Sequence, residues 1–297
     1  MSGEIDAPCV RLELISRPEA ARLVRSMSSA AAEALGFDPE LQGDINTAVA
    51  EACNNVILHA YGGAPGPMAV ELEARADAVE VSIRDHGCGM RQAIPELDRL
   101  KVGLALMSAL ADRAEFISPP GGGTEVRLAF TSRSELSPLE LSARVPVANG
   151  DDPDDDPARS TPADSGGRVL TLPGDVVLTV SPVSLLGPIL GRVGRTLAPS
   201  AGFSLERCYD VYLLTDALAA HATRAAQAGA ISVALGARDR RLEFALAPLR
   251  VGSGGRLEAA ASDTPVDALS LLTEEIAISA VDGYETLHVS MRDRRRG

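Results

Sequence analysis

The sequence contains no tryptophan, and aromatic residues make up only 3% of its 297 positions. Apolar residues account for 45% and charged residues for 23%, which is typical of a globular protein whose cores are filled by Ala, Leu and Val. No stretch approaches about 18 consecutive apolar residues, so no membrane span is predicted. The first residues, Met1 to Asp6, lack the basic and apolar regions of a secretory leader.

Basic residues are also scarce. Lys and Arg total 28 against 41 Asp and Glu, which gives a net charge of −13, and Lys101 is the single lysine. This balance argues against a nucleic-acid partner, because such proteins bind by neutralising phosphates. The four cysteines are widely spaced and form no CxxC pair, which argues against a zinc site and a disulfide framework. We therefore expect a protein of the reducing cytoplasm.

One segment differs in composition from the rest. Residues 131–167 hold five of the 19 prolines and an acidic run from Asp151 to Asp156. Such a segment buries too little apolar surface to offset the entropy of ordering it, which predicts a flexible linker. It separates two predicted domains of equal length, residues 1–130 and 168–297.

The two domains read as copies of one pattern. Each has a strand, a helix, a Gly-Phe turn (Gly36-Phe37 and Gly202-Phe203) and a longer second helix, predicted over 39–60 and 205–226. Two alternating strands, a short helix (103–111 and 266–272) and a strand hairpin follow in both copies. Helices on one side of a mixed or antiparallel sheet form a two-layer sandwich, so the sequence predicts an α+β fold made twice in tandem.

Four weak signals occur in order in the first domain. Glu51, Asn55 and His59 share one face of the second helix, because four residues are slightly more than one turn. An Asp-x-Gly-x-Gly segment, residues 85–89, then lets the backbone turn tightly against a planar ligand. Gly103-Leu104 is predicted at a helix start, whose free N–H groups favour phosphate, and 121–124 reads Gly-Gly-Gly-Thr.

This order resembles the N, G1, G2 and G3 boxes of the GHKL ATPase superfamily, and more closely the bacterial anti-sigma-factor serine/threonine kinases. The resemblance covers about residues 10–130. It implies a Bergerat-type ATP-binding fold, with ATP and Mg²⁺ as cofactors. It also implies a sigma factor, a STAS-type anti-sigma antagonist or both as partners. The charge balance and the lack of long apolar runs predict that no nucleic acid and no membrane is bound directly.

The resemblance also implies site residues. Asn55 would hold Mg²⁺ against the triphosphate, and Asp85 would accept a hydrogen bond from the adenine amine. Glu51 would accept the proton of the attacking Ser or Thr hydroxyl, a sensible role because phosphoryl transfer needs positioning more than covalent help. The other nucleotide contacts would be Gly87 and Gly89 in the adenine pocket, Gly103 and Leu104 by the phosphates, and Thr124, which supports adenine through Asp85 or a water.

Some positions depart from the family pattern. Ala105 stands where the family usually has a second glycine, and the predicted lid, residues 91–101, contains no glycine. Aligning the Gly-Phe turns places Ala217 and His221 opposite Glu51 and Asn55. A shift by one residue gives Asp216 and Ala220 instead. Either alignment lacks the metal-binding asparagine, which predicts a degenerate second copy without the nucleotide motifs.

The leading hypothesis is an ATP-dependent anti-sigma regulatory factor, a serine/threonine protein kinase that phosphorylates an anti-sigma antagonist, sequesters a sigma factor, or does both. The alternative is a non-catalytic nucleotide-sensing module that sequesters a regulatory protein. A third reading is a small ATPase that changes shape on turnover. Because kinases of this family commonly act as homodimers, the second copy would supply the partner protomer's surface within one chain, or dock a protein ligand.

Overall fold

The structure, a computed structural model, describes residues 7–75, 78–89, 97–119, 122–131, 176–254, 272–281 and 283–294. The predicted linker therefore lies outside the described residues, except for Thr131. Most of the predicted nucleotide lid and of the predicted helix 266–272 also lies outside them.

The described elements of each half follow the predicted order. The first half comprises β1 (Cys9–Ile15), α1 (Ala20–Ala34), α2 (Pro39–Asn55), a π-helical turn (Val56–Ala60), β2 (Pro67–Ala74), β3 (Ala78–Asp85), α3 (Leu97–Leu110), β4 (Arg113–Ile117) and β5 (Thr124–Thr131). The second half comprises β6 (Val176–Ser181), a 3-10 turn (Val183–Leu185), α5 (Leu186–Ser200), α6 (Leu205–Ala225), β7 (Ile231–Arg238), β8 (Arg241–Leu249), β9 (Glu275–Val281) and β10 (Tyr284–Arg292).

The strands of both halves join in one ten-stranded antiparallel sheet with the order β4-β5-β3-β2-β1-β6-β7-β8-β10-β9. Corresponding strands of the two halves lie at equal positions on either side of the central β1–β6 pair. In that pair Leu12 lies opposite Leu178, its own counterpart when the Gly-Phe turns are aligned. The two halves are thus related by a local twofold axis that passes between these two leucines.

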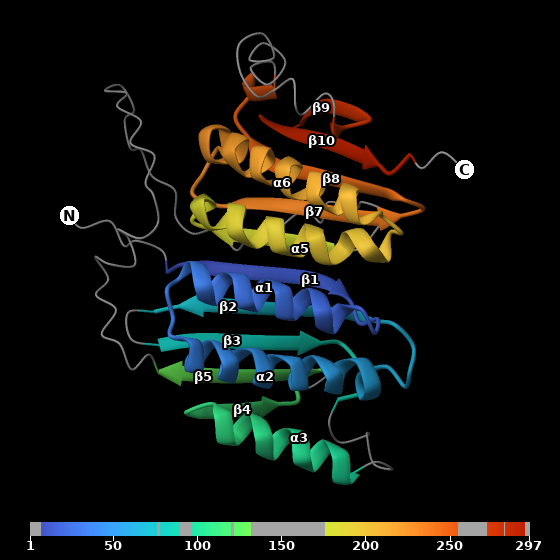
Figure 1. Cartoon of the computed structure of the whole chain (residues 1–297). Coiled ribbons are helices and arrows are strands. Elements are labelled where there is room, and N and C mark those ends of the chain that lie inside the picture. Colours follow the sequence, from blue (N-terminus) through green and yellow to red (C-terminus); the bar gives the residue numbers. More distant parts are fainter. Residues whose placement is uncertain are drawn as a thin grey trace, which may run out of the picture.

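The long helices form a second layer on one face of the sheet. Figure 1 shows α1, α2, α5 and α6 side by side in front of the strands, with α3 next to the β4 edge. Alternate strand residues such as Val10, Leu12 and Leu14 of β1 point into the core beneath the helices. The fold is therefore the predicted two-layer α+β sandwich, made twice and joined edge to edge.

The Gly-Phe turns end the first helix of each half in the same way. Gly36 and Gly202 have φ values of +76° and +79°, a conformation that suits glycine at a helix C-terminus. The following Phe37 and Phe203 are buried, and each donates its backbone N–H to a carbonyl in the last helical turn. The second helices then begin with side-chain caps from Asp38 and Ser204.

The contact between the halves continues from the sheet into the helical layer. Here α1 packs on α5, and Ser26 Oγ lies 2.6 Å from Thr196 Oγ1. Glu33 forms an ion pair with Arg192. Within the part of the chain that the structure describes, no helix is long and apolar enough to cross a bilayer.

Candidate functional site

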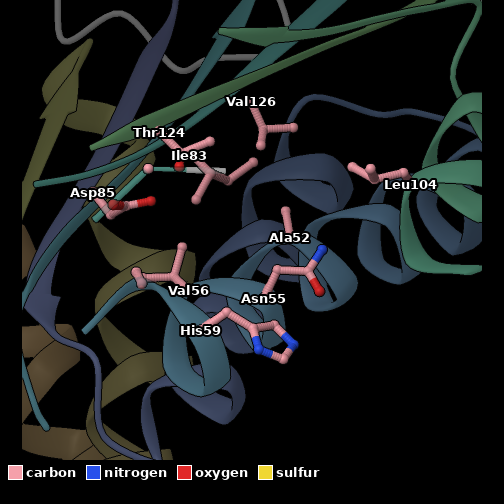
Figure 2. Close-up of a pocket in the computed structure, with 11 residues that line it drawn as sticks. Ala52, Asn55, Val56, His59, Ile83, Asp85, Leu104, Thr124 and Val126 are labelled. Atoms are coloured by element: carbon pink, nitrogen blue, oxygen red, sulfur yellow. The ribbon is translucent and has the colours of Figure 1, made fainter. Parts of the chain in front are cut away.

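One pocket of the first half gathers five of the residues predicted from the sequence. They are Asn55, Asp85, Gly89, Leu104 and Thr124. Figure 2 shows the pocket between α2 and the strands, with Asp85 at one end, Leu104 at the other and Asn55 between them on the helical side. His59, which the sequence analysis placed on the same helix face as Asn55, also lines it. The apolar walls come from residues that the sequence analysis did not single out: Ala52, Val56, Ala60, Ile83 and Val126.

Asp85 is the most constrained polar group of this pocket. It ends β3 and is only 6% exposed. Its Oδ1 accepts a hydrogen bond from Gly87 N at 2.8 Å, and among the described residues its second oxygen has no donor. The sheet register pairs Asp85 with Thr124 of β5, so the two side chains lie next to each other on the pocket side. A buried carboxylate with one oxygen free fits a ligand that donates a hydrogen bond.

The loop after Asp85 packs backbone against backbone. A Cβ added at Gly87 would lie 2.0 Å from the carbonyl oxygen of Ala60, and one at Gly123 would lie 2.3 Å from that of Asp85. Gly123 N also donates to Gly87 O at 2.7 Å. The two glycines are therefore needed because any side chain would separate the strand ends that form the Asp85 end of the pocket.

A π-helical turn closes the helical side. It spans Val56–Ala60, directly after Asn55, and Ala60 O accepts the N–H of Cys88 at 2.8 Å. Such wide turns occur mainly where a helix is adapted to a function. Here the turn carries the end of α2 onto the Gly-x-Gly loop, a feature that the helical pattern of the sequence did not reveal.

Tyr61 supports the same loop from outside the pocket. Its hydroxyl donates to Pro67 O at 2.5 Å and accepts the N–H of His86 at 2.8 Å. Burial raises the pKa of Tyr61, against the opposing effect of the hydrogen bond from His86, so the hydroxyl keeps its proton. The only sequence signal for this role was an aromatic residue placed immediately after the motif helix.

Asn55 and His59 lie one turn apart, and both are half-buried at the pocket wall. Among the described residues, no group of three or more His, Cys, Asp or Glu side chains is placed to hold a metal ion. Asn55 offers one amide oxygen, so a cation there would take its other ligands from a nucleotide and water. That arrangement suits Mg²⁺, which usually keeps several waters and binds through substrate phosphates.

The surroundings of Gly103 differ from the prediction. It was expected at a helix start, but α3 begins at Leu97, so the N–H groups of Gly103 and Leu104 are not those of a helix terminus. Gly103 instead faces Glu51: a Cβ added to it would lie 2.3 Å from Oε1. Glu51 does not line the pocket but lies one turn before Asn55, directed at α3. The glycine is explained by the packing of α2 on α3.

The second half has a different arrangement at the matching place. Leu249 is paired with Glu285, as Asp85 is paired with Thr124. The Glu285 carboxylate accepts the N–H groups of Gly252 and Gly254 at 2.6 and 2.9 Å, which lowers its pKa. His221, opposite Asn55 in the repeat, is buried, with no hydrogen-bond partner for Nε2 among the described residues. The second half thus lacks the acidic strand end and the asparagine of the first.

The first half of the chain is similar to known proteins. A family described as "Histidine kinase-like ATPase domain" matches residues 14–130. The anti-sigma F factor of Pasteuria penetrans is 32% identical over 127 residues, which are 38% of this chain and 80% of that protein. The anti-sigma F factor of Clostridium beijerinckii is 32% identical over 128 residues, which are 39% of this chain and 88% of that protein.

A solved structure of the RsbU and RsbW domains of Rv1364c from Mycobacterium tuberculosis is 27% identical, with a TM-score of 0.35, over 43% of this chain and 33% of that chain. The assignment rests on the two sequence relatives, most of whose length is matched by the first half. The chain therefore belongs to the GHKL anti-sigma-factor kinase family, through a histidine kinase-like ATPase domain in its first half.

Proposed function

We propose that the chain is a cytoplasmic ATP-dependent anti-sigma regulatory factor with serine/threonine protein kinase activity. Its first half would bind ATP and Mg²⁺ and phosphorylate an anti-sigma antagonist of the STAS type, and the whole chain would sequester a sigma factor. The observation that carries the proposal is the Asp85 carboxylate, which is buried at the pocket's end. One of its oxygens accepts a hydrogen bond from Gly87 N, and the other has no donor among the described residues.

Each residue would act at one part of the nucleotide. The free oxygen of Asp85 would accept the exocyclic amine of adenine, while the apolar walls enclose the ring. Thr124 would fix the carboxylate from the neighbouring strand, and Asn55 would lie at the triphosphate. Bound Mg²⁺ would supply neutralising charge on the phosphate oxygens. Glu51 would accept the proton of the attacking hydroxyl from one turn further back on α2.

The second half would take the place of a partner protomer. It joins the first through β1 and β6 and through α1 and α5, about a local twofold axis. This geometry supports an intramolecular pair in which a single half binds nucleotide. We therefore expect one ATP for each chain.

One observation favours the non-catalytic alternative. Glu51 lies against Gly103 and outside the pocket lining, so its carboxylate must move toward Asn55 before it can meet a hydroxyl at the phosphates. If it stays against α3, the protein binds ATP as a signal and sequesters its partner without transferring phosphate.

The test combines calorimetric titration with Mg-ATP and transfer of labelled γ-phosphate to each STAS-type protein of the source organism. We expect one site for each full-length chain, loss of binding in Asp85→Asn, and loss of Mg²⁺ dependence in Asn55→Ala. Asn54→Ala is the matched control, because Asn54 is the exposed neighbour on the same helix. Unchanged ATP binding in Asp85→Asn would refute the assigned site, and tight binding without transfer to any acceptor would select the alternative.

A further inference from the structure

The second half carries an exposed apolar stripe on α6, with no counterpart in the first half. Four residues on one side of the helix form this α6 stripe: Leu205, Tyr209, Tyr212 and Leu213, which are 93%, 66%, 46% and 42% exposed. Single exposed apolar residues are ordinary, whereas four on one helical face indicate a contact surface. Two of the four tyrosines of the whole chain are in it, and tyrosine is enriched at protein interfaces.

The repeat shows that the fold does not require the stripe. In the alignment of the Gly-Phe turns, the same positions of α2 are occupied by Pro39, Gly43, Asn46 and Thr47. Asn46 is used internally, because it accepts a hydrogen bond from Ser28 at 2.7 Å and donates one to Ser29 at 2.8 Å, which tie α2 to α1. Tyr212 stands at the matching position of α6 with its ring half exposed. The stripe is thus specific to the copy that lacks the nucleotide motifs.

A groove runs beside the stripe. It has a volume of about 580 Å³ and lies between α1, α5 and α6, with Tyr212 in its wall. Its depth comes from two glycines of α5, Gly187 and Gly191, which face α6. A Cβ at Gly191 would lie 3.6 Å from Thr215 and 3.7 Å from the Tyr212 ring, which are ordinary van der Waals distances. The exposed side chains of the stripe and the adjoining groove together form a surface on which a protein segment could bind.

The charge at this place indicates what such a segment carries. The Arg195 guanidinium lies over the Tyr212 ring, 5.7 Å from its centroid, and within the described residues it has no carboxylate partner. Arg192 in the same wall is already paired with Glu33, and Asp216 marks the point where the apolar stripe ends. The Asp216 carboxylate also lines the groove, but the charge that lies directly against the Tyr212 ring is the Arg195 guanidinium, and it complements a carboxylate.

We propose that the α6 stripe and the adjoining groove bind the sequestered partner protein, through a segment that presents apolar side chains and a carboxylate placed to meet Arg195. This inference rests on the proposed function. There, the antagonist that receives the phosphate must reach the ATP pocket of the first half. The protein that is held without being phosphorylated, the sigma factor, then docks on the second half. The degenerate copy thereby acquires a function of its own instead of serving only as a partner for β1.

The test measures the affinity of the full-length chain for each purified sigma factor of the source organism. We expect the double variant Tyr209→Ser/Tyr212→Ser to bind about 10-fold more weakly or worse, as for central aromatic contacts. Arg195→Glu should also weaken binding, without a change in Mg-ATP titration. Val251→Ser, which alters an apolar residue of the same half that is 65% exposed, is the matched control and should bind normally.

The outcomes separate the two proposals. If the wild-type chain binds a sigma factor and the stripe variants bind it equally well, the docking surface is wrong while the proposed function stands. If the wild-type chain binds none, sequestration itself fails and the docking inference fails with it. If the wild-type chain dimerises and the double variant is monomeric, the stripe is a contact between copies and the inference is overturned. If the double variant does not fold, the affinity of Arg195→Glu for the sigma factor tests the docking surface in its place.

Discussion

The Glu51 carboxylate lies so close to the α-carbon of Gly103 that an added methyl carbon would sit 2.3 Å from its Oε1. This contact connects the proposed base on α2 with α3, the helix whose first residues, 97–101, belong to the predicted lid. Any side chain at Gly103 must displace either Glu51 or α3. The glycine therefore controls where the carboxylate lies relative to Asn55.

The substitution Gly103→Ala should lower phosphate transfer about 10- to 100-fold, because the added methyl group pushes α3 and α2 apart, and a displacement of about 1 Å of the reacting groups that α2 carries is enough for such a loss. ATP binding should change much less, since Gly103 is not part of the pocket lining. Steady-state kinetics with an unphosphorylated acceptor protein would measure the phosphate transfer, and calorimetry would measure the ATP binding. Gly43→Ala is the control, because nothing lies within 4 Å of a Cβ there; equal losses in both variants would disprove the role of the contact.

Gly87 gives a second prediction, this time for nucleotide binding. A Cβ at Gly87 would lie 2.0 Å from Ala60 O, so Gly87→Ala must push the loop away from the π-helical turn. We expect a loss of about 1–3 kcal/mol in the free energy of unfolding, as for other overpacked sites, and weaker ATP binding. Denaturant unfolding and calorimetry are the measurements. Gly62→Ala should cost less, because only its φ of +61° is unfavourable, and an equal loss would contradict the packing argument.

The fold could be predicted from the sequence because its signals are local and occur twice. The alternation in the strands and the Gly-Phe turns fix the elements of each half, and both glycines have the positive φ that this turn requires. What the pattern did not contain was the connection between the halves. The pairing of β1 with β6 depends on backbone hydrogen bonds at a strand edge. The alternation of apolar and polar side chains does not indicate which strand edges pair.

The candidate site could also be predicted only in part. The pocket brings together Asn55, Asp85 and Thr124, which are far apart in the sequence, and the motif order had anticipated that. The prediction that Gly103 begins a helix was wrong, because α3 extends back to Leu97. A glycine at a phosphate-binding helix end and a glycine needed for a carboxylate contact look identical in sequence. Only the packing of α2 on α3 distinguishes them.

A pH dependence of stability is expected from His221. Burial lowers its pKa from the ordinary value of 6.5, and Arg224 lowers it further while Glu285 opposes the shift. The unfolded chain therefore takes up a proton near pH 6.5 that the folded chain resists, so stability is complete above that pH and falls as the pH drops below it. The loss cannot exceed about 1.4 kcal/mol for each pH unit.

The free energy of unfolding, measured with denaturant at several pH values on both sides of about 6.5, tests this dependence. His221→Leu should remove the slope, and it also removes a buried Nε2 that has no hydrogen-bond partner among the described residues. His288→Gln is the control, because His288 lies at the sheet surface with Ser279 Oγ 3.0 Å away. A slope that persists in His221→Leu would assign the dependence to other groups.

The central strand pair gives the last prediction, which concerns the first half alone. Removing residues 131–297 would leave β1 as an unpaired edge, and such edges bind another strand. A second copy of β1 fits the place of β6, because Leu12 would again lie opposite a leucine at the local twofold axis. The same register would place Arg11 opposite Glu13 of the other copy, whereas in the full chain they face Thr179 and Val177. Cross-strand pairs of opposite charge stabilise a sheet.

We therefore expect residues 1–130 to form a homodimer in sedimentation and native mass measurements, and the full-length chain to leave β1 unavailable for this pairing. In the isolated half, Arg11→Pro should abolish the dimer, because proline removes a backbone donor and is excluded from the interior of a sheet. Glu13→Arg should weaken the dimer by placing like charges opposite each other, and Arg11→Glu/Glu13→Arg should restore it. A fragment that remains monomeric at concentrations of tens of micromolar would show that the β1–β6 contact depends on the tether between the halves and not on the complementarity of the strands.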